Sequence, residues 1–149
     1  MRKLMRNCAV LSAVVLCTVS MYGCGGQNKA ENSPVTYKDG TYEAEGVPDS
    51  FGGKVKVHIT IKDSKISDVT MENIDVNGNE KDEDYGKQDG EIKNEGLYKI
   101  AQAAVTNSKE YPSKLIETQD IEKVDAIAGA TESNVSFKEA VKLALKNAK

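Results

Sequence analysis

A strict alternation of apolar and polar residues constrains the fold of this chain more than any other feature. Residues 55–62 read VKVHITIK, so every second side chain is a branched apolar one. Successive side chains of a strand point to opposite faces, and this segment therefore predicts a strand with one buried face. Residues 63–64 form a candidate turn, and residues 65–73 are expected to return as a partner strand. The apolar residues of that partner change phase at residues 67–68, which indicates a β-bulge.

The second half of the chain has helical periodicity. Apolar residues recur at helical spacing over residues 97–105, and Pro112 is expected to end or restart that helix. A last helix is predicted from about residue 134 to residue 148. Ser136 and Glu139 would form a capping box if that helix began a turn later.

These segments predict an α+β domain with a twisted antiparallel sheet and helices packed on one of its faces. Residues 41–46 are expected to add an edge strand, and the polar, acidic residues 74–90 a long surface loop. Core packing is the expected role of the aromatic residues Tyr98 and Phe137.

The N-terminal segment has the features of a lipoprotein leader. Three basic residues precede the largely apolar residues 9–21, and residues 21–24, MYGC, are similar to a lipobox. The apolar part is shorter than the ~20 residues that span a membrane, and its length suits a secretory signal. We expect a signal peptide over residues 1–23 and a lipid on Cys24, with an uncleaved N-terminal anchor as the alternative. Either arrangement places the domain on the outer face of the cell membrane.

The composition of the mature chain excludes several classes of function. Cleavage removes Cys8 and Cys17, which leaves Cys24 as the one remaining cysteine and no thiolate metal site. Residues 24–36 are expected to be the lipidated cysteine and a flexible tether, and residues 37–149 one domain. Loss of three basic residues lowers the net charge from −3 to −6 and leaves no arginine. This acidic chain is not expected to bind nucleic acid or anionic head groups.

Residues 125–131, DAIAGAT, form a small-residue turn that presents a threonine hydroxyl just ahead of a helix. The first N–H groups of a helix are unpaired and lie at the positive end of its dipole, which favours a bound phosphate. Thr131 is therefore a candidate to carry a phosphate group. A turn followed by a capped helix, without any ligand, is the alternative interpretation.

With Ser133 included, the pattern Asp125-x-x-x-Gly129-Ala130-Thr131-x-Ser133 resembles the flavinylation motif of the bacterial FMN-binding domain family. The resemblance extends from about residue 37 to the end of the chain. It includes, in the family's order, three further segments: YKDGTY at 37–42, YPSKLI at 111–116 and AVKLAL at 140–145.

Two positions depart from the family pattern. Ala128 stands where the family usually has Ser or Thr, and Asn134 stands where it often has a second Ser. A missing hydroxyl at residue 128 would slow or prevent modification if it assists the transferase or binds the phosphate.

The resemblance implies that a flavin transferase joins FMN to Thr131 through a phosphoester. Gly129 would permit the turn, whereas Asp125 and Ser133 would orient the loop or be recognised by the transferase. The implied protein is an electron carrier rather than a stand-alone enzyme. It would pass electrons from a membrane quinol-linked dehydrogenase to an extracytoplasmic acceptor or reductase. The alternatives are a cofactor-free binding or structural lipoprotein of the same fold and, less favoured, a self-contained flavin reductase.

Other polar residues give weaker indications of a site. His58 is the only histidine, and the strand alternation places it on the exposed face. Residues 75–86 begin like a calcium loop, but Glu80 and Gly86 occupy the positions that need Gly and Glu. The acidic residues of 80–84 are expected to be solvated, and no metal site is predicted.

Overall fold

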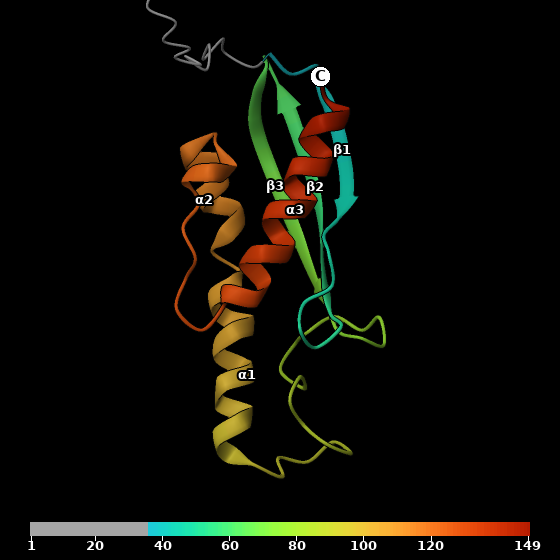
Figure 1. Cartoon of the computed structure of the whole chain (residues 1–149), viewed down its shortest axis with the longest axis vertical. Helices are drawn as coiled ribbons and strands as arrows, with labels where there is room; N and C mark the ends of the chain where they lie inside the picture. The colour runs from blue at the N-terminus through green and yellow to red at the C-terminus, as the bar shows by residue number, and fades with distance from the viewer. Residues whose placement is uncertain (1–35) are drawn as a thin grey trace, which may run out of the picture. The chain divides into compact units, whose positions relative to one another are not determined.

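The computed structural model describes residues 36–149, which form a three-stranded antiparallel sheet with helices packed on one face (Figure 1). The strands are β1 (Gly40–Glu45), β2 (Lys54–Lys62) and β3 (Lys65–Ile74), in the order β1-β2-β3. This arrangement confirms the predicted α+β class and all three predicted strands.

The predicted leader, Cys24 and all of the tether except Thr36 lie outside the described residues. Within residues 36–149, no helix has the length and apolar character needed to cross a membrane.

Short-range geometry explains how β2 and β3 pair. Asp63 and Ser64 both have positive φ angles, 52° and 59°, as the two-residue hairpin turn that matches strand twist requires. Ser67 is the extra residue between the pairs Thr60 with Asp68 and Ile61 with Ile66. This bulge confirms the predicted change of phase, and it lets the apolar residues on both sides of Ser67 face the core.

The helices form the second layer. They are α1 (Glu95–Ser108), α2 (Tyr111–Thr118), the short 3-10 helix η1 (Ile121–Lys123) and α3 (Thr131–Asn147). The long helix α3 packs on β1 and β2, and α2 packs on β3. Figure 1 shows α1 extending beyond the end of the sheet, and its C-terminal residue Ser108 lies near Asn73 of β3.

The apolar face of β2 meets a continuous stripe of α3. The side chains of Val55, Val57, Ile59 and Ile61 are at most 2% exposed. From α3, the predicted stripe is buried in full: Phe137, Val141, Ala144, Leu145 and Ala148. The ring of Phe137 stacks on that of Tyr111 with 5.5 Å between centroids, which confirms its core role.

The predicted start of the last helix and the predicted core role of Tyr98 were wrong. The helix α3 starts at Thr131 rather than about residue 134, and Ser136 lies inside it instead of capping it. Its hydroxyl accepts a hydrogen bond from the Val55 N–H at 2.9 Å, which connects helix to sheet. Tyr98 is not in the core, because α1 extends past the sheet. Its hydroxyl donates to the Glu83 carbonyl at 2.8 Å.

Candidate functional site

A cavity of about 750 Å³ lies where α1 and the start of α3 face the loop after β3. Its lining comes from α1, from the segment between β1 and β2, from the loop of residues 75–94 and from the first turn of α3. Binding sites for small molecules and cofactors have volumes of roughly 300–1,000 Å³. The cavity is therefore large enough for a cofactor.

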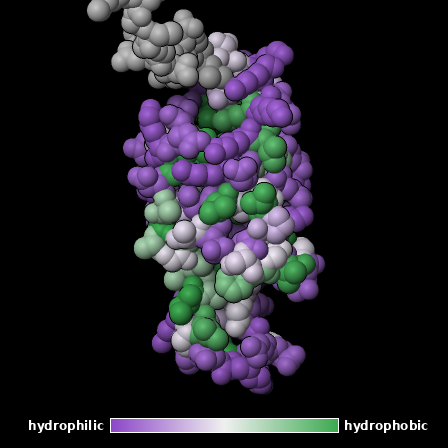
Figure 2. Space-filling view, in the orientation of Figure 1, coloured by the Kyte–Doolittle hydropathy of each residue, from purple (hydrophilic) through white to green (hydrophobic). Residues whose placement is uncertain are grey.

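Exposed apolar side chains line one wall of this cavity. Leu97 and Ile100 of α1 are 63% and 66% exposed, and Phe51 and Val76, which also line the cavity, are 71% and 67% exposed. Figure 2 shows hydrophobic residues gathered over the part of this face where α1 lies. Several large apolar side chains left in water around one hollow are typical of a surface that another molecule covers.

Thr131 opens α3 at the edge of the cavity. Its side chain is exposed, and it lines the cavity together with Gly129, Ala130 and Ser133. The N–H groups of Thr131, Glu132 and Ser133 have no hydrogen-bond acceptor within residues 36–149, and no side chain caps the helix. The hydroxyl therefore lies beside unpaired donors at the positive end of a 17-residue helix.

The turn before Thr131 requires its glycine. The Ala130 N–H donates to the Ile127 carbonyl at 2.9 Å, and Gly129 between them has a φ angle of +82°. Side chains disfavour this left-handed conformation, so Gly129 is needed for backbone geometry. A Cβ there would come no closer than 3.5 Å to Asn107. The predicted role of Gly129 in the turn is thus consistent with the structure.

Sequence reasoning missed two residues that hold this turn. The Tyr111 hydroxyl donates to the Ala130 carbonyl and accepts from the Ile127 N–H, both at 3.0 Å. Burial raises the pKa of this tyrosine above its usual value. The Asn107 amide donates to the Ala128 carbonyl at 2.8 Å. Helices α1 and α2 therefore fix the turn, and no local pattern in the sequence identifies these distant partners.

Ser133 and Asn134 are both buried below the start of α3. The Asn73 amide of β3 donates to the Ser133 hydroxyl at 3.0 Å, and Ser108 lies 3.4 Å from the same amide. Ser133 thus joins the first turn of α3 to the sheet, which favours an orienting role. The Nδ2 of Asn134 has no hydrogen-bond partner within the described part of the chain.

Asp125 and Ala128 do not line the cavity. Asp125 is exposed beside a separate hollow of about 220 Å³, which Lys114 and Lys123 also line. Ala128 is exposed on the turn itself. The structure therefore gathers four of the five predicted cofactor-binding residues at one cavity and leaves Asp125 outside it.

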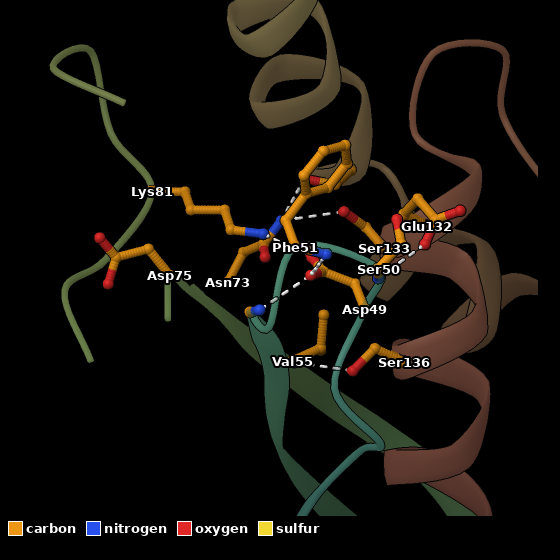
Figure 3. A network of polar contacts seen from close by, with 12 residues as sticks. Asp49, Ser50, Phe51, Val55, Asn73, Asp75, Lys81, Glu132, Ser133 and Ser136 are labelled. Carbon is orange, nitrogen blue, oxygen red and sulfur yellow. Dashed lines mark hydrogen bonds and ion pairs between the residues drawn. The ribbon is translucent and has the colours of Figure 1, made fainter. Parts of the chain in front are cut away.

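A buried ion pair lies in the wall of the cavity, and no local pattern in the sequence indicates it. The Lys81 ammonium is 2.8 Å from the Asp49 carboxylate, and the two side chains are 6% and 4% exposed (Figure 3). The acidic residues around Lys81 are exposed, as predicted for this loop. Lys81 itself is the exception, because a buried carboxylate from a distant segment pairs with it.

Asp49 also orders the segment that carries Phe51. Its Oδ1 accepts hydrogen bonds from the Phe51 and Gly53 N–H groups at 2.9 and 2.8 Å. Burial alone would raise the pKa of Asp49, but the hydrogen bonds from Lys81, Gly53 and Phe51 outweigh it and hold that pKa below its usual value. Asp49 is therefore a carboxylate at neutral pH.

The other candidate residues have structural partners. On the exposed face of the sheet, His58 lies 3.3 Å from Glu43 and 3.5 Å from Glu72. Asp75 accepts hydrogen bonds from the N–H groups of Asn77 and Asn79 at 2.8 Å. Across residues 36–149, no group of three or more His, Cys, Asp or Glu side chains could hold a metal ion.

Comparison with known proteins identifies relatives of this domain. The sequence model of the FMN-binding domain matches residues 50–146. The crystal structure of the CPE2226 protein of Clostridium perfringens is similar, with 28% identity, a TM-score of 0.58 and coverage of 75% of this chain and 88% of that chain. A solution structure from Clostridium thermocellum has 27% identity and a TM-score of 0.44, covering 75% and 92% of the two chains. No curated protein gave a significant match.

Proposed function

Because the chain belongs to the FMN-binding domain family, we propose that it is a membrane-anchored electron carrier with FMN joined to Thr131 through a phosphoester. One observation carries this proposal. An exposed threonine hydroxyl stands at an uncapped helix start and opens into a cavity with an apolar wall. The electron donor would be a membrane quinol-linked dehydrogenase, and the acceptor an extracytoplasmic reductase or other oxidant.

The residues of the cavity fit both ends of FMN. The phosphate end suits Thr131, where three unpaired N–H groups and the helix dipole favour negative charge. The isoalloxazine ring suits the wall formed by Leu97, Ile100 and Phe51, whose exposed apolar surface a flat aromatic ring would cover. When bound, the flavin would supply the electron chemistry, and this chain would supply position and electrostatics.

A covalent link would keep FMN on a protein outside the membrane, where the concentration of free FMN is low. A flavin site of micromolar affinity provides ~8 kcal/mol of binding free energy and would empty where free FMN is scarce. An ester at Thr131 removes that equilibrium. It also lets the ring remain partly exposed to redox partners, which accords with a cavity open to solvent.

The proposed attachment reaction transfers the FMN group of FAD to the Thr131 hydroxyl. The Thr131 hydroxyl loses its proton and attacks the FMN phosphorus of FAD, the pyrophosphate bond breaks, and AMP leaves. The experiment is incubation of the protein with flavin transferase and FAD, followed by acid precipitation. We expect flavin absorbance to remain with the precipitated protein and AMP to form in equal amount. Soluble flavin and no AMP would contradict the proposal.

Ala128 is the position that favours the cofactor-free alternative. We predict that Ala128→Ser leaves the free energy of unfolding within about 1 kcal/mol, because residue 128 is exposed on a turn. A restored hydrogen bond to a charged group is worth roughly 1.5–3 kcal/mol and would raise the rate of loading about tenfold if it acts in the transition state. Time courses with transferase and FAD compare the two proteins. Loading of the serine variant alone would favour the cofactor-free alternative for the natural chain, and equal rates would show that Ala128 is harmless.

Anchoring is tested separately at Cys24. Two acyl chains on this cysteine would bury many methylene groups at ~0.8 kcal/mol each, so the protein would not leave the membrane. Cys24→Ala is therefore predicted to release the protein from membranes or to leave its leader uncleaved. Cell fractionation and the mass of the N-terminal peptide provide the measurement. A normally processed, fully membrane-bound variant would refute lipidation.

A further inference from the structure

The buried ammonium group of Lys81 has N–H donors that are not used in hydrogen bonds to the described residues. An ammonium group has three N–H donors. Within residues 36–149, the Lys81 Nζ donates one hydrogen bond, to Asp49 at 2.8 Å, and it lies 5.1 Å from the centroid of the Tyr85 ring. Since Lys81 also lines the cavity, a bound molecule with a negative or electron-rich edge can accept one of the remaining donors.

Lys81 is connected to the first turn of α3 through Asn73. The backbone N–H of Lys81 donates to the Asn73 backbone carbonyl at 2.7 Å. The side-chain amide of Asn73 in turn donates to the Ser133 hydroxyl at 3.0 Å. Figure 3 shows Lys81 and Ser133 reaching Asn73 from opposite sides. The unpaired N–H groups beside Thr131 already provide donors for the phosphate, so the charge of Lys81 is available to another part of the ligand.

We propose that Lys81 contacts the pyrimidine edge of the flavin ring and favours the reduced state, with Asp49 setting the size of this effect. The inference rests on the proposed binding of FMN in this cavity. Two electrons from the donor and one proton from water leave a single negative charge on that edge of the ring. A cation held a few ångströms away in a site sheltered from water stabilises this charge.

If Lys81 contacts the flavin ring, removing either charge of the ion pair changes the redox potential, whereas a purely structural ion pair would not affect it. Removing Lys81 leaves the negative Asp49 facing the ring and disfavours reduction. Removing the charge of Asp49 leaves Lys81 unopposed and favours reduction. Substitutions of Lys81 and of Asp49 are therefore expected to shift the redox potential in opposite directions. Both substitutions are expected to destabilise the fold.

The test compares four loaded proteins at pH 7: wild type, Lys81→Met, Asp49→Asn and the double variant. Each is titrated spectroscopically against a dye of known potential. We expect Lys81→Met to lower the equilibrium constant for reduction about tenfold, which is roughly 30 mV for a two-electron couple. Asp49→Asn should raise it, and the double variant, which leaves no unpaired buried charge, should lie between the single variants. Lys54→Met, at an exposed pair with Glu45, is the control and should change nothing.

Shifts of the same sign, or no shift, would overturn the role of Lys81. A lower rate or extent of loading with an unchanged potential would place Lys81 at the phosphate and would also overturn it.

A second measurement does not depend on attachment at Thr131. Riboflavin has no phosphate, and equilibrium dialysis measures its oxidised and reduced forms separately. Wild type should bind the reduced form about tenfold more tightly than the oxidised form, and Lys81→Met should lose this preference. Absence of covalent flavin would refute only the phosphoester. Absence of any preference for reduced riboflavin, or of riboflavin binding, would refute the role of Lys81.

Discussion

Thr131→Val abolishes covalent attachment of flavin and leaves the fold intact. Valine keeps the branched shape of threonine and removes the exposed hydroxyl at the first residue of α3, which lines the cavity. The side chain is exposed, so the free energy of unfolding should change by about 0.5 kcal/mol or less. Peptide mapping after incubation with transferase and FAD measures the result.

Thr70→Val is the matched control for this change. Thr70 is also exposed, but it lies on β3 and does not line the cavity. We expect the control to load like the wild type. A flavin-bearing peptide from Thr131→Val would show that FMN is attached elsewhere.

Lys81→Met destabilises the domain by about 3–5 kcal/mol. The change leaves the Asp49 carboxylate, only 4% exposed, without its cation, and removing one partner of a buried ion pair costs about this much. It also frees the loop of residues 75–94, which Lys81 connects to the segment between β1 and β2. Urea unfolding followed by circular dichroism measures the difference.

Lys54→Met is the control that distinguishes loss of a buried ion pair from loss of any lysine side chain. Lys54 lies 3.4 Å from Glu45, but their side chains are 43% and 51% exposed, so water screens the pair. Exposed pairs contribute about 0–1 kcal/mol, and the control should lose no more than that. Equal losses in the two variants would mean that the buried pair adds nothing special to stability.

The fold was largely predictable because its main signals are local. The alternation of β2 needs only residues 55–62, and the phase change at Ser67 is enough to locate the bulge. The start of α3 was placed too late because Ala130 at the N-cap has no capping side chain. A helix whose first N–H groups have no side-chain cap gives no capping signal in the sequence.

Only the part of the site formed by neighbouring residues was predictable, because the rest depends on tertiary contacts between distant segments. The local pattern around Gly129 and Thr131 located the turn. The periodicity of residues 97–105 predicted a helix with an apolar side, but periodicity does not record what that side contacts, and Leu97 is 63% exposed. Lys81 stands in an acidic, polar run, and its buried partner Asp49 lies 32 residues away.

Intact mass under denaturing conditions tests the central claim most directly. The full chain is produced together with its flavin transferase, purified and denatured before measurement. We predict a mass increased by that of FMN minus one water, with the yellow colour remaining on the unfolded protein. An unmodified mass, with any flavin released on denaturation, would contradict covalent attachment at Thr131.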